Sequence, residues 1–161
     1  MPAADGRHDF DFLFGSWTVK NRRLRERLAG SNDWEEFPSE CTCRPILDGL
    51  GNLDEFTLHP QSGPLQAMTV RLYNLSAGEW SIYWVAGTGA GRFDPPMVGG
   101  FDGPRGEFYS HETYRGRHIL ARFIWASLSG DACRWEQAYS VDGGKSWETN
   151  WIMEFTRTAD R

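Results

Sequence analysis

Apolar and polar side chains alternate along most of this chain, as they do in half-buried β-strands. In residues 79–86, for example, Trp80, Ile82 and Trp84 would share one face. Clusters of Gly, Asn, Asp, Ser and Pro separate the alternating segments and are typical of turns. No segment has the spacing of a long amphipathic helix. The pattern therefore predicts about ten strands, at residues 16–28, 34–45, 52–58, 66–74, 79–86, 97–102, 106–114, 118–127, 133–140 and 147–157.

Short strands that follow one another at short intervals favour an antiparallel meander. We expect this meander to close into a single all-β barrel, because closure removes exposed strand edges. Residues 9–15 predict a short helical turn that plugs one end with Phe10, Leu13 and Phe14. The chain has no repeat and no linker, so we expect one domain over residues 1–161, with residues 1–8 as a flexible tail.

One hairpin carries a specific turn signature. Residues 140–147 match the Asp-box pattern, Ser-x-Asp-x-Gly-x-Ser/Thr-Trp. In such a turn Asp142 would accept backbone N–H bonds, Gly144 would supply a positive φ, and Trp147 would pack beneath the turn. We expect these three residues to be structural and to fix the register of the last two strands.

Strict alternation from this hairpin predicts the inner wall of the barrel. In residues 147–157 the core face would begin at Trp147 and include Thr149, and residues 133–140 would turn Gln137 inward. Polar groups on an apolar inner wall need a partner, which can be a side chain, water or a ligand. The predicted ligand-binding residues of the wall are Trp84, Trp135, Gln137, Tyr139, Thr149 and Trp151.

The strand at residues 106–114 is ambiguous. One face carries Glu107 and His111, and the other carries Phe108 and Glu112. If the first face pointed inward, Glu107 and His111 would be titratable groups in a cavity and candidates for catalytic acid and base. If it pointed outward, both would be ordinary surface residues. The sequence leaves this choice open.

The longest loop, residues 87–96, is rich in glycine but lacks the strand–loop–helix context of a phosphate-binding loop. A mobile flap over the barrel mouth is one interpretation, and Arg92 and Phe93 would then contact the ligand. A connection without a role is the other.

Composition limits the partners. The net charge of −5 argues against nucleic acid and anionic membranes. No signal peptide and no apolar run of membrane-spanning length are visible, so we expect a cytoplasmic protein. Three cysteines predict buried thiols and no disulfide framework, and neither a metal site nor a cofactor is expected. The aromatic content of 14% suits either a packed core or stacking on a flat ligand.

Gly15, Trp17 and Arg157 carry a family resemblance. A Gly-x-Trp that opens a strand meander, together with an Arg on the last strand, resembles the calycin superfamily of lipocalin-like and fatty-acid-binding-protein-like barrels. The resemblance implies that Trp17 plugs one end of the barrel and that Arg157 lies against its ring. It favours the cytoplasmic bacterial members. The haem-binding branch needs a ligand His near the end of the chain, and no His follows His118.

Three functions remain open at this point. The leading one is a barrel that binds a small flat or apolar molecule. The second is a cofactor-independent cyclase, isomerase or decarboxylase that uses Glu107 or His111. The third is a solid-packed structural barrel that acts as a homodimer. A cavity below about 300 Å³ would favour the packed barrel.

Overall fold

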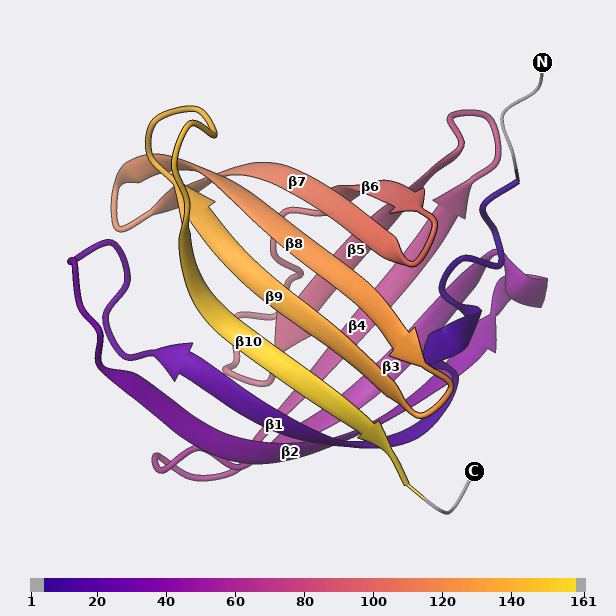
Figure 1. The fold of residues 1–161 in the computed structure, drawn as a ribbon, viewed down its shortest axis with the longest axis horizontal. Coiled ribbons are helices and arrows are strands. Elements are labelled where there is room, and N and C mark those ends of the chain that lie inside the picture. Colours follow the sequence, from indigo (N-terminus) through magenta and orange to yellow (C-terminus); the bar gives the residue numbers. More distant parts are fainter. Residues whose placement is uncertain (1–4, 159–161) are drawn as a thin grey trace.

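The computed structural model describes residues 5–158, which form ten antiparallel strands closed into one barrel (Figure 1). Each strand pairs with its neighbours in sequence, and the first strand pairs with the last. The predicted all-β barrel is confirmed. The strands are β1 (Gly15–Leu24), β2 (Trp34–Ile46), β3 (Gly51–Leu58), β4 (Leu65–Asn74), β5 (Glu79–Ala86), β6 (Met97–Asp102), β7 (Arg105–Tyr114), β8 (Arg117–Ser129), β9 (Ala132–Ser140) and β10 (Glu148–Arg157).

A plug fills one end of the barrel. The 3₁₀ turn η1 (Asp11–Leu13) precedes β1 and buries Phe10 and Leu13 completely. A second 3₁₀ turn, η2 (Leu47–Gly49), connects β2 to β3. The Phe10 ring meets the edge of Trp80 with 5.0 Å between ring centroids. The predicted helical plug is therefore present, and it seals this end with aromatic contacts.

Trp17 and Arg157 hold the plug in place. The Trp17 indole N–H donates to the Leu13 carbonyl at 2.8 Å. The Arg157 guanidinium lies 4.2 Å from the centroid of the Trp17 ring and donates to the carbonyls of Phe12 and Phe14. One arginine on the last strand thus binds backbone carbonyls of the plug that have no strand partner.

Gly15 gives Arg157 the room that it needs. Its φ is +112°, and a Cβ at this position would lie 2.6 Å from Nη1 of Arg157. Both the backbone conformation and the close approach require glycine here.

Part of the expected N-terminal tail packs on the barrel. The Gly6 N–H donates to the Tyr73 hydroxyl at 2.9 Å, and the Trp80 indole donates to the Gly6 carbonyl at 3.0 Å. Residues 1–4 of that tail lie outside the described residues.

A β-bulge changes the faces of β10. The register against β9 shifts between Thr149 and Trp151, so Asn150 and Trp151 are both buried. Strict alternation from Trp147 to Phe155 is therefore wrong at the bulge. Thr149 pairs with Ala138 and shares its outward side, whereas Trp151, two residues further along, points inward.

The barrel has a short seam between β5 and β6. Only three residue pairs join these strands, from Trp80–Gly99 to Ile82–Met97. Beyond the seam, two backbone bonds join the loop of residues 87–96 to β5, from the Thr88 N–H to the Ala86 carbonyl at 2.8 Å and from the Asp94 N–H to the Trp84 carbonyl at 2.9 Å. The barrel wall therefore has few paired residues between its strands where this loop lies.

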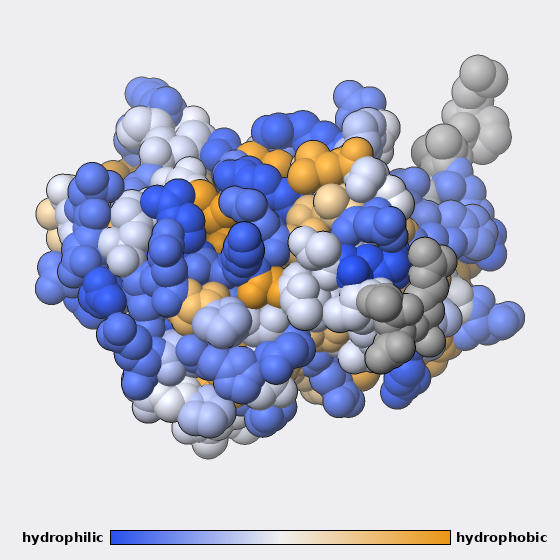
Figure 2. All heavy atoms as spheres, turned by 60° about the horizontal axis from the view of Figure 1, so that its bottom comes forward, coloured by the Kyte–Doolittle hydropathy of each residue, from blue (hydrophilic) through white to orange (hydrophobic). Residues whose placement is uncertain are grey.

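The outside of the barrel is mainly polar. Figure 2 shows scattered apolar patches among blue, hydrophilic side chains on the face that it presents. The three cysteines are free and buried, as expected. Within residues 5–158, no helix is both long and apolar enough to cross a membrane.

The close approach of Gly15 to Arg157 generates the first prediction. Gly15→Ala places an alanine at a positive φ and makes its Cβ clash with Arg157. We expect it to lower the free energy of unfolding by about 2–4 kcal/mol. Gly63→Ala is the matched control, because φ of Gly63 is +114° and nothing lies within 4 Å of its Cβ position. The control should lose only about 1–2 kcal/mol. Urea denaturation measures both, and equal losses would contradict the role given to Arg157.

Candidate ligand-binding cavity

A cavity of about 160 Å³ lies inside the barrel, between the plug and the open end. Eight of the ten strands, the loop of residues 87–96 and Arg27 of the β1–β2 connection contribute to its wall. The lining residues are Arg27, Phe56, Thr69, Arg71, Ile82, Trp84, Asp94, Pro95, Met97, Glu112, Phe123, Trp125, Trp135, Gln137, Tyr139, Trp151 and Met153.

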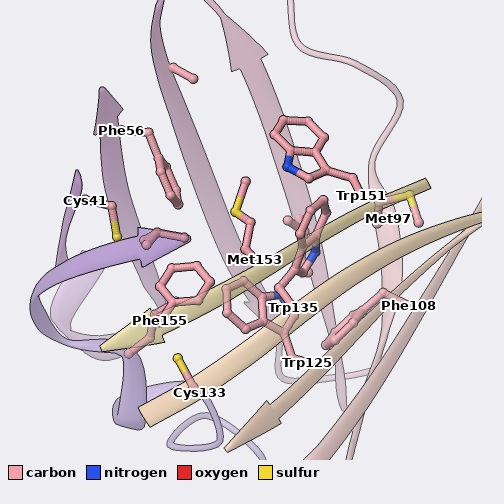
Figure 3. Close-up of a cluster of buried hydrophobic side chains, with 14 of the residues drawn as sticks. Cys41, Phe56, Met97, Phe108, Trp125, Cys133, Trp135, Trp151, Met153 and Phe155 are labelled. Atoms are coloured by element: carbon pink, nitrogen blue, oxygen red, sulfur yellow. The ribbon is translucent and has the colours of Figure 1, made fainter. Parts of the chain in front are cut away.

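Aromatic rings form most of the apolar wall. The Trp135 and Trp151 rings meet edge to face with centroids 5.4 Å apart, and Trp84 meets Trp151 in the same way at 6.0 Å. Figure 3 shows Met153 among the rings of Trp135, Trp151 and Phe155. Edge-to-face packing leaves ring faces and edges directed at the remaining space, which suits a flat guest.

Gln137 and Tyr139 bring polar atoms to this wall. The Gln137 side-chain N–H donates to Asn150 Oδ1 at 2.8 Å, so the bulge fixes its amide. The Tyr139 hydroxyl accepts from Arg27 Nη1 at 3.0 Å. Burial raises the pKa of Tyr139, which keeps its hydroxyl neutral at physiological pH. Both polar groups are therefore held in fixed positions.

The floor of the cavity contains a buried ion pair. Arg71 Nη2 lies 2.7 Å from Asp54 Oδ2, and Arg71 Nη1 donates to Asn52 Oδ1 at 2.8 Å. The guanidinium centre lies 5.2 Å from the ring centroids of both Phe10 and Trp125. A charge pair with almost no exposure is stable only with such hydrogen bonds and neighbouring rings. The plug residue Phe10 therefore supports the floor from below.

Two acidic groups line the side where the seam lies. Asp94 comes from the loop and Glu112 from β7. Burial, together with the negative charge of Asp94, raises the pKa of Glu112 to about 7. Burial also raises the pKa of Asp94. Both carboxyl groups thus hold a proton at higher pH than is usual.

The loop reaches the cavity with residues other than those expected. Asp94 and Pro95 line the cavity, whereas Arg92 and Phe93 do not. The Phe93 ring packs on Tyr83, with 5.8 Å between centroids, and is 42% exposed. The backbone of Asp94 is held against β5 by the bond from its N–H to the Trp84 carbonyl.

The open question about β7 is answered by its burial pattern. Phe108 is buried and Glu112 lines the cavity, so Glu107 and His111 lie on the outer face. Glu107 accepts from Arg105 and Tyr109, and these bonds lower its pKa. His111 stacks on His118 with centroids 5.4 Å apart. Neither candidate acid or base reaches the cavity.

Five of the six predicted wall residues do line it: Trp84, Trp135, Gln137, Tyr139 and Trp151. Thr149 does not, because the bulge turns it outward. Among residues 5–158, no group of three or more His, Cys, Asp or Glu side chains gathers in a way that would hold a metal ion.

The Asp-box hairpin lies away from the cavity. Asp142 accepts the Ser146 N–H at 2.9 Å, and bonds from Ser146 and Ser140 lower the pKa of Asp142. Trp147 packs near Gly144 and lies 4.2 Å from the Arg122 guanidinium. This geometry agrees with the structural roles expected for the turn.

The sequence analysis missed the ionic groups of the site. Arg71 and Asp54 belong to the inner face, and Arg27, Asp94 and Glu112 line the open half. One signal was available for Arg71: if Trp80 faces inward, its hairpin partner Tyr73 does too, and alternation then places Arg71 inside.

The cavity volume bears on the three functions. At about 160 Å³ the cavity is smaller than the 300 Å³ or so at which drug-sized pockets begin, so by the criterion given above the volume favours the solid-packed barrel. The barrel is thus more completely filled by its own rings than a lipid carrier would be. It still holds far more space than the roughly 30 Å³ of one water molecule.

No protein-family model matches the sequence, and no curated protein matches it either. Among solved structures, the chain is similar to Rv2717c from M. tuberculosis, with 11% identity and a TM-score of 0.65 over 96% of this chain and 98% of that one. A second match is EF1p2_mFAP2b, whose structure is bound to DFHBI, with 12% identity and a TM-score of 0.48 over 95% of this chain and 99% of that one. The first likeness supports the barrel fold.

The raised pKa of Glu112 predicts how stability depends on pH. An acid whose pKa is higher in the folded state than in the unfolded state makes folding less favourable as pH rises from about 4.5 to about 7. We expect Glu112→Gln to remove this decline, and to be about 1–2 kcal/mol more stable than the unmodified protein at pH 8 but not at pH 4.

Glu107→Gln is the control for this prediction, because the pKa of Glu107 is shifted in the opposite direction. Its stability should not rise at pH 8. Urea denaturation at several pH values measures both variants. An unchanged pH profile in Glu112→Gln would show that Glu112 ionises normally in the folded protein.

Proposed function

We propose that this protein is a calycin-type binding protein for a small molecule with a single planar ring. The observation that carries the proposal is the cavity of about 160 Å³. Its apolar lining includes Trp84, Trp135 and Trp151, and Gln137 and Tyr139 contribute polar atoms. An apolar cavity with a few fixed polar groups is the usual form of a small-molecule site.

The volume sets the size of the ligand. An engineered cavity of about 150 Å³ in another protein binds benzene. The present cavity is of the same size, so a single substituted ring fills it. A fatty acid or a fused polycycle is too large for it. This limits the class of flat or apolar ligand that the sequence alone suggested.

The wall suits such a ring for two reasons. Trp84, Trp135 and Trp151 offer large contact areas at low conformational cost, because their packing against one another already fixes their rotamers. Gln137 and Tyr139 are fixed by Asn150 and Arg27, so they can orient a polar substituent without rearrangement.

The position of Glu107 and His111 supports binding over catalysis. Both lie on the outer face, so the acid–base pair on which the enzymatic alternative depended is outside the cavity. Asp94 and Glu112, whose pKa values are raised by burial, do line the cavity and are the acidic groups that remain to that alternative.

Thermal unfolding with ligands tests the proposal. Phenol should raise the melting temperature, because binding to the folded state alone stabilises it, and palmitate should not. At about 100 times the dissociation constant the gain is about 2.7 kcal/mol, or roughly 5–10 °C for a chain of this size.

Two variants locate the effect. Trp135→Ala should abolish the shift caused by phenol, because it removes a wall of the cavity. Trp34→Ala is the control, since this indole bonds to Asn32 and does not line the cavity. Equal shifts in both variants, or a larger shift with palmitate than with phenol, would contradict the proposal.

A further inference from the structure

Two fully buried hydrogen-bond donors on residues of the cavity wall have no partner. Arg71 Nε and Trp125 Nε1 are buried, and neither has an acceptor among the described residues. Arg71 is 1% exposed and Trp125 is 3% exposed, and both side chains line the cavity. Buried donors are nearly always satisfied in native proteins, so two of them in one cavity point to an acceptor that the chain itself does not supply.

These donors belong to one cluster at the cavity floor. The Arg71 guanidinium centre lies 5.2 Å from the centroid of the Trp125 ring. Nη1 and Nη2 of Arg71 are already engaged by Asn52 and Asp54, so Nε is the nitrogen that remains. Trp125 is fixed by its contact with Phe155, at 5.4 Å between centroids. Neither donor can turn toward another partner without disturbing this packing.

We propose, as an extension that rests on the proposed function, that the ring bound in this cavity carries an uncharged carbonyl oxygen, which accepts hydrogen bonds from Trp125 Nε1 and Arg71 Nε. A carbonyl oxygen has two lone pairs and so can accept from both donors. The ligand class is therefore an aryl ketone, an aryl amide or a ring lactam of single-ring size.

The charges around the cavity favour a neutral acceptor over a carboxylate. The charge of Arg71 is already balanced by Asp54, at 2.7 Å. A carboxylate at the floor would leave one uncompensated negative charge in the interior, which is costly. Two further acidic groups, Asp94 and Glu112, line the same cavity, and the remaining cation, Arg27, is bonded to Tyr139.

The donors also discriminate against hydrocarbons. A ring without an acceptor would displace solvent from the floor and leave both N–H groups unpaired. Sites built to bond a polar group reject analogues that lack it far more strongly than they reject analogues of altered size. We therefore expect preference to follow the carbonyl and not the apolar area.

Three probes of nearly equal shape test this preference. Acetophenone carries a carbonyl, isopropylbenzene replaces it with a methyl group, and benzoate replaces it with a charged carboxylate. Calorimetric titration should show that acetophenone binds at least about tenfold more tightly than each of the other two. The carbonyl stretch of bound acetophenone should also move to lower frequency, as it does when the oxygen accepts hydrogen bonds.

A pair of variants assigns the effect to the donor. Trp125→Phe removes one unpaired N–H. The affinity for acetophenone should therefore fall to that for isopropylbenzene, while the affinity for isopropylbenzene should change little. Phe123→Leu is the matched control. It trims a ring of the same cavity that carries no N–H, and it should weaken both probes alike.

The outcomes separate this inference from the proposed function. If none of the three probes binds the unmodified protein, the proposed function fails. If acetophenone and isopropylbenzene bind equally, or if the carbonyl frequency does not move, the cavity binds rings but the inference is wrong, and water satisfies the donors. Should Trp125→Phe fail to fold, the frequency measured in the unmodified protein and in Phe123→Leu still decides the question.

Discussion

The ion pair between Arg71 and Asp54 lies where the plug, the wall and the cavity meet. Its charges are almost fully withdrawn from water, so removing either partner would leave the other buried and uncompensated. Asp54 also accepts the Thr69 N–H at 3.1 Å, which ties the pair to the backbone of β4. Phe10 packs against the guanidinium from the plug side, and Trp125 from the wall. The position of the cavity floor therefore depends on the plug.

The two ends of the chain hold that plug in place. Arg157 belongs to the last strand and bonds to carbonyls of the segment before the first strand, so it joins the chain ends where β1 and β10 also pair. A substitution that loosens the plug would displace Phe10 and then Arg71, and so would alter the floor of the cavity. At the opposite end lie the loop of residues 87–96 and the β1–β2 connection, which Arg27 ties to Tyr139 and Leu28 ties to Glu148.

Much of the architecture was predictable from the sequence, because alternation and turn residues report directly on strands. The roles of Gly15, Trp17 and Arg157 in sealing one end agree with the resemblance that suggested them. Three features were not predicted. The bulge at Asn150 adds one residue to β10 without a glycine or proline to mark it, and so Thr149 was assigned to the wrong face.

The second feature is the inner face of β4, for which the pairing of Tyr73 with Trp80 was the available signal. Here the apolar set Met68, Val70 and Leu72 points outward, and Arg71 points inward. Hydrophobicity alone selects the opposite face, because the gain from the Asp54 ion pair is not visible in a one-dimensional pattern. The third feature is the set of acidic groups around the cavity, since Asp94 and Glu112 meet there only after the barrel closes. Long-range proximity of this kind depends on the completed topology.

The short seam between β5 and β6 affects how the barrel exchanges its contents with solvent. Three residue pairs and the backbone bonds from Thr88 and Asp94 hold this part of the wall, whereas ten residue pairs join β7 to β8. Local opening follows the region with the fewest cooperative contacts. Ligand entry and exit can therefore proceed by fraying of the seam while the other hydrogen-bonded ladders remain intact. In that case the lifetime of a complex depends on the opening rate of the wall as well as on the contacts inside it.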